Sequence, residues 1–273
     1  MEKYVIVGFS GGKDSTALLL RMIELNEQID EILCCDTYKE FPAMYRHIEK
    51  VKEKIKDKNI KFTLLKHERT FDEWMFEYEV KRKNPDAFYA KWGKDAKGKS
   101  WATSRARWCT GRLKIDLIDK YIKDLRKKYD LVHCIGLAAD EVKRLERPNA
   151  KESYFRYPLV EWGWTEQDCL EYCYSLGYDW EGLYQDFKRV SCWCCPLQPL
   201  DSLRTLRKKY PELWEELKDM DRRTWQQFRA DYSVEELDKR FAYEEQRIAE
   251  GKSIKNKDFF NNLKELLKPT DET

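Results

Sequence analysis

Short apolar runs separated by longer helical patterns dominate the first half of the chain. Residues 4–9 are β-branched and apolar, and a polar stretch with two glycines separates them from a helical pattern. The predicted strands are residues 4–9, 31–35, 60–65 and 131–136, and the predicted helices are residues 17–26, 43–56, 70–80 and 113–129. Strands that are apolar throughout, and that are separated by helices, indicate an α/β fold around a parallel sheet.

The pattern becomes helical after the fourth predicted strand. Thr165–Asp168 has the form of a capping box, and Gly177 would end the helix that it starts. Residues 200–267 have a helical pattern, with a second capping box at Ser233–Glu236. Because no repeat or low-complexity linker is visible, we place one boundary near Pro196. The predicted parts are an α/β domain at residues 1–196 and a helical C-terminal extension at residues 197–273.

The composition supports a folded protein and excludes several classes. The 273 residues are 42% apolar and 14% aromatic, which is sufficient for a compact core and an appendage. No apolar run approaches the roughly 18 to 20 residues that cross a bilayer, and no signal sequence precedes the first strand. The nine cysteines are an odd number, which argues against a disulfide framework. We expect a cytoplasmic protein with no membrane association.

The stretch between the first predicted strand and helix has the chemistry of a phosphate-binding loop. Its residues are Ser10, Gly11, Gly12, Lys13, Asp14, Ser15 and Thr16. The glycines leave backbone N–H groups open to phosphate oxygens at a helix N-terminus, while the hydroxyls and the lysine add donors. The spacing is not that of a Walker A loop. The alternative is a tight turn in which the glycines serve backbone geometry alone.

Several separated motifs together resemble one known family. Residues 10–15 match the loop of the PP-loop ATP pyrophosphatases, and the motif after the second strand resembles their phosphoadenosine phosphosulfate reductase branch. The further matching motifs are Asp36-Thr37 with Glu40-Phe41-Pro42, Trp108-Cys109-Thr110 with Leu113-Lys114, Gly136 with Glu141 and Arg144, and Tyr157-Pro158-Leu159 with Trp162. Over about residues 4–200 the resemblance implies a doubly wound, mainly parallel sheet of the adenine nucleotide alpha-hydrolase type, with the nucleotide over the strand ends.

In a nucleotide pocket of this kind, candidate contacts follow two further strands. Asp36 and Thr37 end the second strand and could contact ribose, adenine or a phosphate-bound Mg²⁺, while the alternative for Asp36 is a strand-end turn. Gly136 ends the fourth strand in the same way. Arg144 and Arg147 suit bidentate binding of phosphate, and their alternative is a solvated helix face paired with acidic neighbours.

Three cysteines fall within four residues, in Cys192-Trp193-Cys194-Cys195. Such density indicates metal or redox chemistry rather than packing. Zinc would take four ligands in a closed tetrahedron. The candidate ligands are Cys109, Cys192, Cys194 and Cys195.

The resemblance favours a 4Fe-4S iron–sulfur cluster over zinc. Plant-type sulfonucleotide reductases of the family carry a cysteine pair, a gap of about eighty residues and then C-x-x-C, and the interval from Cys109 to Cys192 matches. Thr110 stands where the second cysteine of the pair is expected, and Cys194 is additional. Either Cys194 is the fourth ligand, or three cysteines bind and the open iron carries a sulfide, as the tRNA-thiolating relatives imply.

Basic residues concentrate in one segment although the whole chain is nearly neutral. The chain has 52 basic and 50 acidic residues, but Lys81–Lys114 holds eleven Lys or Arg against two Asp. Its weak periodicity and its Lys, Gly and Trp content predict a loop. Cations interleaved with Trp92, Trp101 and Trp108 make nucleic acid a candidate partner. The alternative is a solvated loop whose last part binds only nucleotide phosphates, through Arg105, Arg107, Arg112 and Lys114.

One family feature has no counterpart in this sequence. The reductases attack sulfate with a cysteine in a C-terminal tail, whereas no cysteine follows Cys195. The intact loop instead resembles ATP-cleaving relatives that adenylate an oxygen, release pyrophosphate and let sulfur displace AMP. We therefore expect an adenylate-forming sulfurtransferase that uses ATP, Mg²⁺ and an iron–sulfur cluster, with Lys13, Asp14 and Cys194 as catalytic residues.

The expected partners are an adenine nucleotide, a sulfur donor and an acceptor. The donor would be sulfide or a cysteine desulfurase, and the acceptor a nucleic acid or a small molecule. Two alternatives stay open, a sulfonucleotide reductase that uses an external thiol and a nucleotide-binding or cluster-sensing module without turnover. Release of pyrophosphate from ATP, or of sulfite from phosphoadenosine phosphosulfate, distinguishes the three.

Overall fold

The computed structural model describes residues 1–147 and 151–268, which divide into two compact units. The first unit contains Met1–Phe71 and Trp108–Trp193, and the second contains Asp72–Arg107 and Cys194–Thr273. One division therefore falls close to the boundary drawn at Pro196. The membership of Asp72–Arg107 in the second unit differs from the sequence analysis, which treated that segment as part of the α/β domain.

Five parallel strands form the sheet of the first unit, in the order β3-β2-β1-β4-β5. The strands are β1 (Lys3–Gly8), β2 (Glu31–Cys35), β3 (Lys61–Leu65), β4 (Asp130–Ile135) and β5 (Phe155–Arg156). The predicted α/β fold with a parallel sheet is confirmed, and the four predicted strands lie within one residue of their observed bounds at each end. The two-residue β5 has no apolar run that could predict it.

The strand order reverses between β1 and β4. From β1 the chain proceeds outward through β2 to β3, and it then returns to β4 on the other side of β1. Gly8 lies opposite Ile135, so both strands end at the same level of the sheet. In open α/β sheets such a reversal opens a crevice at the carboxyl ends of the strands, and ligands bind there.

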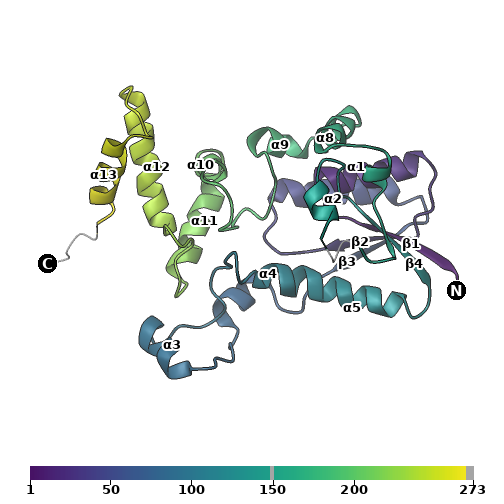
Figure 1. The fold of residues 1–273 in the computed structure, drawn as a ribbon, viewed down its shortest axis with the longest axis horizontal. Helices are drawn as coiled ribbons and strands as arrows, with labels where there is room; N and C mark the ends of the chain where they lie inside the picture. Colours follow the sequence, from purple (N-terminus) through teal and green to yellow (C-terminus); the bar gives the residue numbers. More distant parts are fainter. Residues whose placement is uncertain (148–150, 269–273) are drawn as a thin grey trace. The chain divides into compact units, whose positions relative to one another are not determined.

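Helices cover both faces of this sheet (Figure 1). In the figure α1 (Lys13–Glu24), α2 (Pro42–Ile55) and α8 (Glu166–Ser175) lie on one face and α5 (Asp116–Leu125) on the other, as right-handed connections require when the chain reverses direction. Ile122 of α5 packs against Ile6, Leu33 and Leu131 of the strands. The remaining elements are α4 (Trp108–Thr110), the π-helical turn Gly111–Ile115, α6 (Val142–Leu145), α7 (Pro158–Glu161), the 3₁₀ turn Trp180–Gly182 and α9 (Leu183–Asp186).

The described residues of the second unit are mainly helical. Its elements are the π-helical turn Glu73–Glu77, α3 (Pro85–Trp92), α10 (Leu200–Lys209), α11 (Pro211–Arg222), α12 (Val234–Ala249) and α13 (Lys257–Leu266). The buried carboxylate of Asp221 accepts hydrogen bonds from the Trp101 indole at 2.8 Å and from the Val234 N–H at 2.7 Å. Through these bonds Asp221 connects the segment Asp72–Arg107, which contains Trp101, to α11 and to the start of α12.

The sequence analysis predicted a loop for the basic segment that begins at Lys81. This prediction is wrong at Pro85–Trp92, which form the helix α3. The Asn84 side chain accepts a hydrogen bond from the Ala87 N–H, and Pro85 occupies the first helical position. Trp225 contacts the rings of Phe88 and Trp92, which gives this short helix an aromatic core. Local capping and long-range stacking therefore stabilise a helix where the sequence shows little periodicity.

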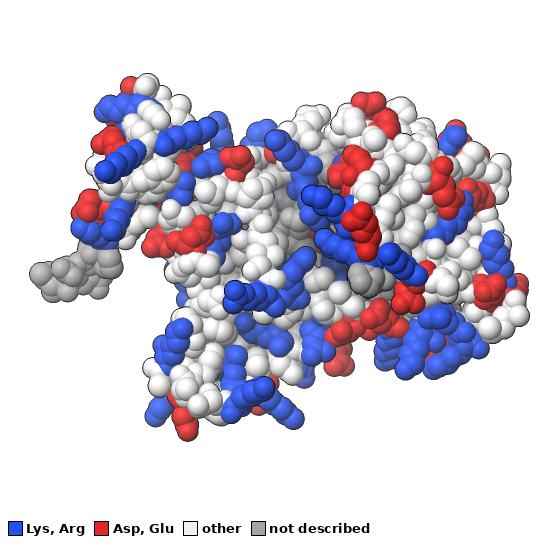
Figure 2. All heavy atoms as spheres, viewed as in Figure 1, with Lys and Arg blue, Asp and Glu red and all other residues white. Residues whose placement is uncertain are grey.

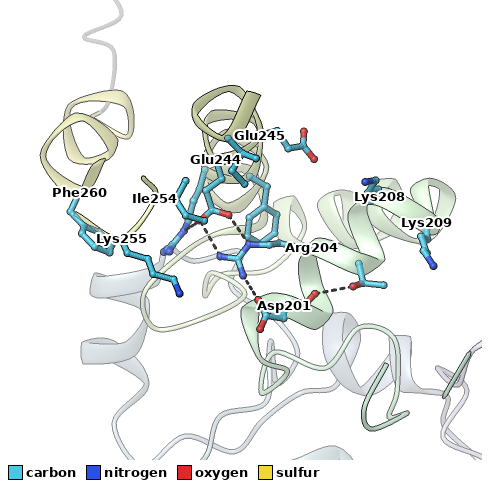
Figure 3. Close-up of a pocket in the computed structure, with 13 residues that line it drawn as sticks. Asp201, Arg204, Lys208, Lys209, Glu244, Glu245, Ile254, Lys255 and Phe260 are labelled. Atoms are coloured by element: carbon cyan, nitrogen blue, oxygen red, sulfur yellow. Dashed lines mark hydrogen bonds and ion pairs between the residues drawn. The ribbon is translucent and has the colours of Figure 1, made fainter. Parts of the chain in front are cut away.

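A pocket of about 510 Å³ lies among α10, α12 and α13 in the second unit (Figure 3). Arg204 lies at its centre and donates hydrogen bonds to Asp201 and to the buried Glu244, which also accepts from Arg240. Burial opposes ionisation of Glu244, but the two guanidinium groups outweigh burial and lower its pKa. The central charges of the pocket are thus neutralised within it, which fits a junction between helices.

None of the helices in residues 1–147 and 151–268 has the combination of length and apolar character that a membrane span requires.

Candidate functional site

The loop between β1 and α1 is held in shape by glycine and by buried partners. Gly11 has φ +78°, a backbone conformation that residues with a side chain rarely adopt. A Cβ there would also lie 2.8 Å from Sδ of Met44, so both the backbone and the packing favour glycine. The Trp180 indole donates a hydrogen bond to the Gly11 carbonyl at 2.7 Å. Thr16 is fully buried and its hydroxyl lies 2.9 Å from Nε2 of His47, so Thr16 supports the loop from behind.

The N-terminus of α1 has the features of an anion-binding site. Gly12 is the N-cap, and it has no side chain with which to cap the helix. The hydroxyls of Ser10 and Ser15 lie 3.1 Å apart, and Ser15 also donates to the Gly12 carbonyl at 3.0 Å. Because these hydroxyls bond within the loop, the backbone N–H groups and the positive end of the helix are the main attraction for phosphate.

Gly136 brings the end of β4 against this loop. A Cβ at Gly136 would lie 2.9 Å from both Cα and N of Ser15, which is closer than ordinary packing allows. The sequence analysis placed Gly136 among the nucleotide contacts. The structure shows a packing requirement that lets β4 end directly beside the loop at the strand reversal.

Lys13 lies between two carboxylates. Its ammonium group forms ion pairs with Asp14 at 2.9 Å and with Glu166 of α8 at 2.5 Å, and its side chain is only 9% exposed. Burial opposes the charge of Lys13, but the two carboxylates outweigh burial and raise its pKa. Burial, with smaller contributions from Glu166 and Glu141, raises the pKa of Asp14 although Lys13 opposes this.

The carboxylates of Asp14 and Glu166 fit a magnesium ion chemically. Mg²⁺ is commonly held by one or two carboxylates together with substrate phosphates rather than by a full protein cage. Among the described residues no group of three or more Cys, His, Asp or Glu side chains forms a metal site. Asp14 and Glu166 are therefore the residues that would hold Mg²⁺ when phosphate supplies the other oxygens.

The carboxylate of Asp36, directly after β2, is bonded to three neighbouring protein groups. Its carboxylate accepts hydrogen bonds from the Tyr38 N–H at 2.8 Å and the Tyr45 hydroxyl at 2.9 Å, and it pairs with Lys66 at 2.8 Å. Burial works against its ionisation, but these three donors outweigh burial and lower the pKa of Asp36. The bond to Tyr38 forms a turn, so the structure has the strand-end turn that the sequence analysis gave as the alternative.

A thiol lies beside the adjoining residues. Sγ of Cys192 is 3.5 Å from the Thr37 hydroxyl, and the Cys192 thiol donates to Oε1 of Glu40 at 3.5 Å. Lys114 lies 3.6 Å from the same Glu40 oxygen. Burial opposes the charge of Lys114, but Glu40, Cys192 and Cys35 raise its pKa. The arrangement gives Cys192 an acceptor for its proton and a cation that stabilises a thiolate.

Family comparison agrees with this geometry. The profile of the phosphoadenosine phosphosulfate reductase domain matches residues 4–198. The chain belongs to the phosphoadenosine phosphosulfate reductase domain family. The match includes the loop after β1, the motif after β2 and the cysteine-rich stretch, so one domain accounts for all three.

Two uncharacterized proteins of Methanocaldococcus jannaschii are similar to this phosphoadenosine phosphosulfate reductase domain protein. One is 26% identical over 224 residues, which are 79% of this chain and 41% of the relative. The other is 24% identical over 264 residues, which are 92% of this chain and 51% of the relative. The chain thus spans about half the length of these relatives or less. A crystal structure of the phosphoadenylyl-sulfate reductase of Candida auris, a phosphate complex, is similar with TM-score 0.45 and 16% identity, over 69% of this chain and 81% of that chain.

Membership of the family does not identify a metal bound by the four predicted cysteine ligands. Cys109 and Cys192 belong to the first unit, whereas Cys194 and Cys195 belong to the second. The described residues contain no metal-binding group of three or more suitable side chains. Cys194, the expected catalytic thiol, is only 2% exposed.

The predicted arginine contacts divide among several environments. Arg144 pairs with Glu141 at 2.6 Å, the helix-face pairing that the sequence analysis gave as the alternative, and Arg147 is exposed. Arg112 pairs with Asp116 at 2.7 Å in the first unit. Arg105 and Arg107 are exposed in the second unit. Lys114 is a predicted substrate contact that the structure places beside Glu40 and Cys192.

Sequence reasoning missed three participants. Glu40 belongs to the motif after β2 that the sequence analysis quoted, but it was given no role. Its position three residues after Thr37, a predicted nucleotide contact, was a usable signal. Glu166 and Tyr184 reach the loop from positions far along the chain, Glu166 by its ion pair with Lys13 and Tyr184 by accepting a hydrogen bond from the Lys13 N–H. No local pattern marks either residue.

Proposed function

We propose that this phosphoadenosine phosphosulfate reductase domain protein is an ATP-dependent, adenylate-forming sulfurtransferase. The observation that most supports this function is the position of two groups on neighbouring strands. A phosphate-binding loop ends β1 and a thiol with a carboxylate and a cation lies beside the end of β2, and these are neighbouring parallel strands of one unit. Phosphate chemistry and sulfur chemistry can then act on one substrate at the carboxyl edge of the sheet.

The first step would activate the acceptor. An acceptor oxygen attacks the α-phosphorus of ATP, the bond from that phosphorus to the pyrophosphate oxygen breaks, and pyrophosphate leaves with the electron pair. The N–H groups at the start of α1 and the Lys13 ammonium stabilise the charge that develops on pyrophosphate. Magnesium bound through Asp14 and Glu166 would add to this stabilisation.

The second step would replace AMP by sulfur. Hydrosulfide attacks the activated atom, the bond to the AMP oxygen breaks, and AMP leaves, so this step needs no oxidant or reductant. If a cysteine desulfurase is the donor, sulfur arrives as a persulfide on Cys192, and a thiol reductant must supply two electrons. Glu40 accepts the proton of Cys192, and Lys114 stabilises the resulting thiolate.

The acceptor is proposed to be a nucleic acid or a small molecule. Seven exposed cations of residues 81–107 form no ion pair with a carboxylate in the described part of the chain. They are Lys81, Lys83, Lys91, Lys94, Lys97, Arg105 and Arg107. Figure 2 shows Lys and Arg side chains gathered around the segment that carries α3. Unpaired surface cations favour a polyanion such as nucleic acid.

A second candidate function is sulfonucleotide reduction with an external thiol, which the family description favours. The 4Fe-4S cluster also stays a prediction from the resemblance. Iron and sulfide analysis of anaerobically purified protein tests it, with Cys192→Ala as the variant that should lose both.

The products of turnover test the proposal. We expect wild-type protein to convert ATP to AMP and pyrophosphate when sulfide and acceptor are present. Lys13→Ala should reduce this rate by about a hundredfold or more, because charge on the leaving group is then less stabilised. Lys58→Ala, in the exposed turn after α2, is the matched control. Sulfite released from phosphoadenosine phosphosulfate, with no pyrophosphate from ATP, would establish the reductase instead.

A further inference from the structure

The first N–H group of α1 already has a partner. The Lys13 N–H donates to the Tyr184 hydroxyl at 2.8 Å. The same hydroxyl would lie 3.2 Å from a Cβ placed on Gly12. The initial N–H groups of a helix have no carbonyl partner within the helix, and in a phosphate loop they face the anion. The Tyr184 oxygen therefore occupies the position that a phosphate oxygen would take.

A phosphate oxygen is a stronger acceptor for this N–H than the Tyr184 hydroxyl. Burial raises the pKa of Tyr184, so the hydroxyl is neutral at physiological pH. Hydrogen bonds to an ionised acceptor are roughly twice as strong as those between neutral groups. The positive end of the helix adds to this preference for an anion. An arriving phosphate can therefore replace the hydroxyl at the Lys13 N–H.

The chain before Tyr184 is fixed to the loop at a different point. Trp180 bonds the Gly11 carbonyl at 2.7 Å, and the exposed side chains of Glu181 and Arg46 form an ion pair at 2.6 Å. Tyr184 packs edge-on against Trp180 with ring centroids 4.8 Å apart. Trp180 therefore fixes the chain next to Tyr184 independently of the bond between the Tyr184 hydroxyl and the Lys13 N–H.

We propose that the Tyr184 hydroxyl is a placeholder for a phosphate oxygen. It satisfies the Lys13 N–H in the free protein and is exchanged for an oxygen of the nucleotide phosphates on binding. This inference rests on the proposed function, because it requires a phosphate at the loop. It has a consequence for selectivity, since a ligand without a phosphate has no oxygen to exchange and gains nothing at this position.

Binding measured by titration calorimetry tests the exchange, with ATP and adenosine as ligands. Tyr184→Phe leaves the Lys13 N–H without its acceptor in the free protein, and ATP binding restores one. We expect Tyr184→Phe to bind ATP about fivefold more tightly than wild type, which corresponds to about 1 kcal/mol. Adenosine affinity should be unchanged. Tyr172→Phe is the matched control, because its hydroxyl donates to Glu24 on the exposed surface.

Three outcomes contradict the inference, and they separate its failure from that of the proposed function. Weaker ATP binding by Tyr184→Phe would show that the hydroxyl donates to the ligand, and an affinity equal to that of Tyr172→Phe would show that it takes no part. In both cases pyrophosphate release by the wild type would leave the proposed function standing. Absence of ATP binding by the wild type would overturn both proposals.

Discussion

The loop after β1 and the basic residues 81–107 both carry positive charge, but they differ in exposure and in pairing with carboxylates. At the loop, Lys13 is 9% exposed and is paired with two carboxylates, and its own N–H is bonded to Tyr184. In residues 81–107, seven cations are exposed and form no ion pair with a carboxylate among the described residues. Under the proposed function, the first arrangement is preorganised for one anion, whereas the second would attract any polyanion and would be weakened by salt.

This difference leads us to expect that the loop determines which ligand binds, and that the basic segment adds affinity for any polyanion. At the loop a ligand must replace existing partners, so only a group of matching charge and shape gains free energy. The exposed cations of residues 81–107 have no carboxylate partner among the described residues that a ligand would have to replace, so we expect binding there to depend mainly on charge density.

The thiol beside the loop should have the largest effect. With a cysteine desulfurase as the sulfur donor, we expect Cys192→Ser to reduce thiolated product by a hundredfold or more, because serine cannot carry a persulfide, while pyrophosphate release continues. Product is measured by mass spectrometry of the acceptor. Cys109→Ser is the control and should retain most of the activity. Equal loss in both variants would indicate a shared cluster and contradict a role for Cys192 alone.

Close packing at the strand reversal should have the next largest effect. Gly136→Ala places a methyl group 2.9 Å from the Ser15 backbone, so we expect the free energy of unfolding to fall by about 1–3 kcal/mol. Gly111→Ala is the matched control, because a Cβ there meets nothing within 4 Å. Denaturant unfolding measures both variants. Equal stability of the two would show that β4 does not approach the loop as closely as described.

A buried histidine should make the support of the loop sensitive to pH. Burial lowers the pKa of His47 to about 4, from about 6.5 in the unfolded chain. Protonation therefore favours unfolding, and stability is lost as the pH falls from about 6.5 towards 4. His47 should account for about 2 kcal/mol of the decrease between pH 7 and pH 5. His47→Asn should remove that part in urea unfolding at the two pH values. An unaltered pH dependence would contradict this, and His67→Asn is the control.

The basic segment should give the smallest effect and the one most sensitive to salt. Lys94→Glu with Lys97→Glu should weaken retention of single-stranded nucleic acid by about three- to tenfold at low salt, and the loss should shrink as salt is raised. Fluorescence anisotropy with a labelled oligonucleotide measures it. The affinity for ATP should be unchanged. Wild-type protein that binds no oligonucleotide even at low salt would leave a small molecule as the acceptor.

The elements that could be predicted from the sequence are those fixed by local chemistry. The run at residues 4–9, the glycines and the following helical pattern lie within one short stretch, so strand, loop and helix were all predicted. Both capping boxes are present, at Thr165 and Ser233, because each needs only four consecutive residues. The α3 helix was missed because its aromatic partner Trp225 is far away in the sequence.

The candidate site was predictable only in part. The loop residues carried their own signal, whereas Glu166 and Tyr184 contact Lys13 across more than 150 residues of chain. Asp36 and Thr37 were correctly placed at a strand end, but their partners Tyr45 and Cys192 follow from packing of α2 and of the chain before Trp193. The cysteine spacing indicated reactive thiols and could not determine which of them lies beside Glu40.

Protection of Cys192 by nucleotide tests the central claim most directly, because it asks whether ATP at the loop lies over the thiol. The rate of alkylation of Cys192 by iodoacetamide is measured by peptide mass spectrometry, with and without saturating ATP. We predict that ATP slows alkylation at least tenfold in the wild type, and that the slowing is lost in Lys13→Ala. An unchanged rate in wild-type protein that is shown to bind ATP would contradict the account, because the phosphate loop and the thiol would then not share one substrate.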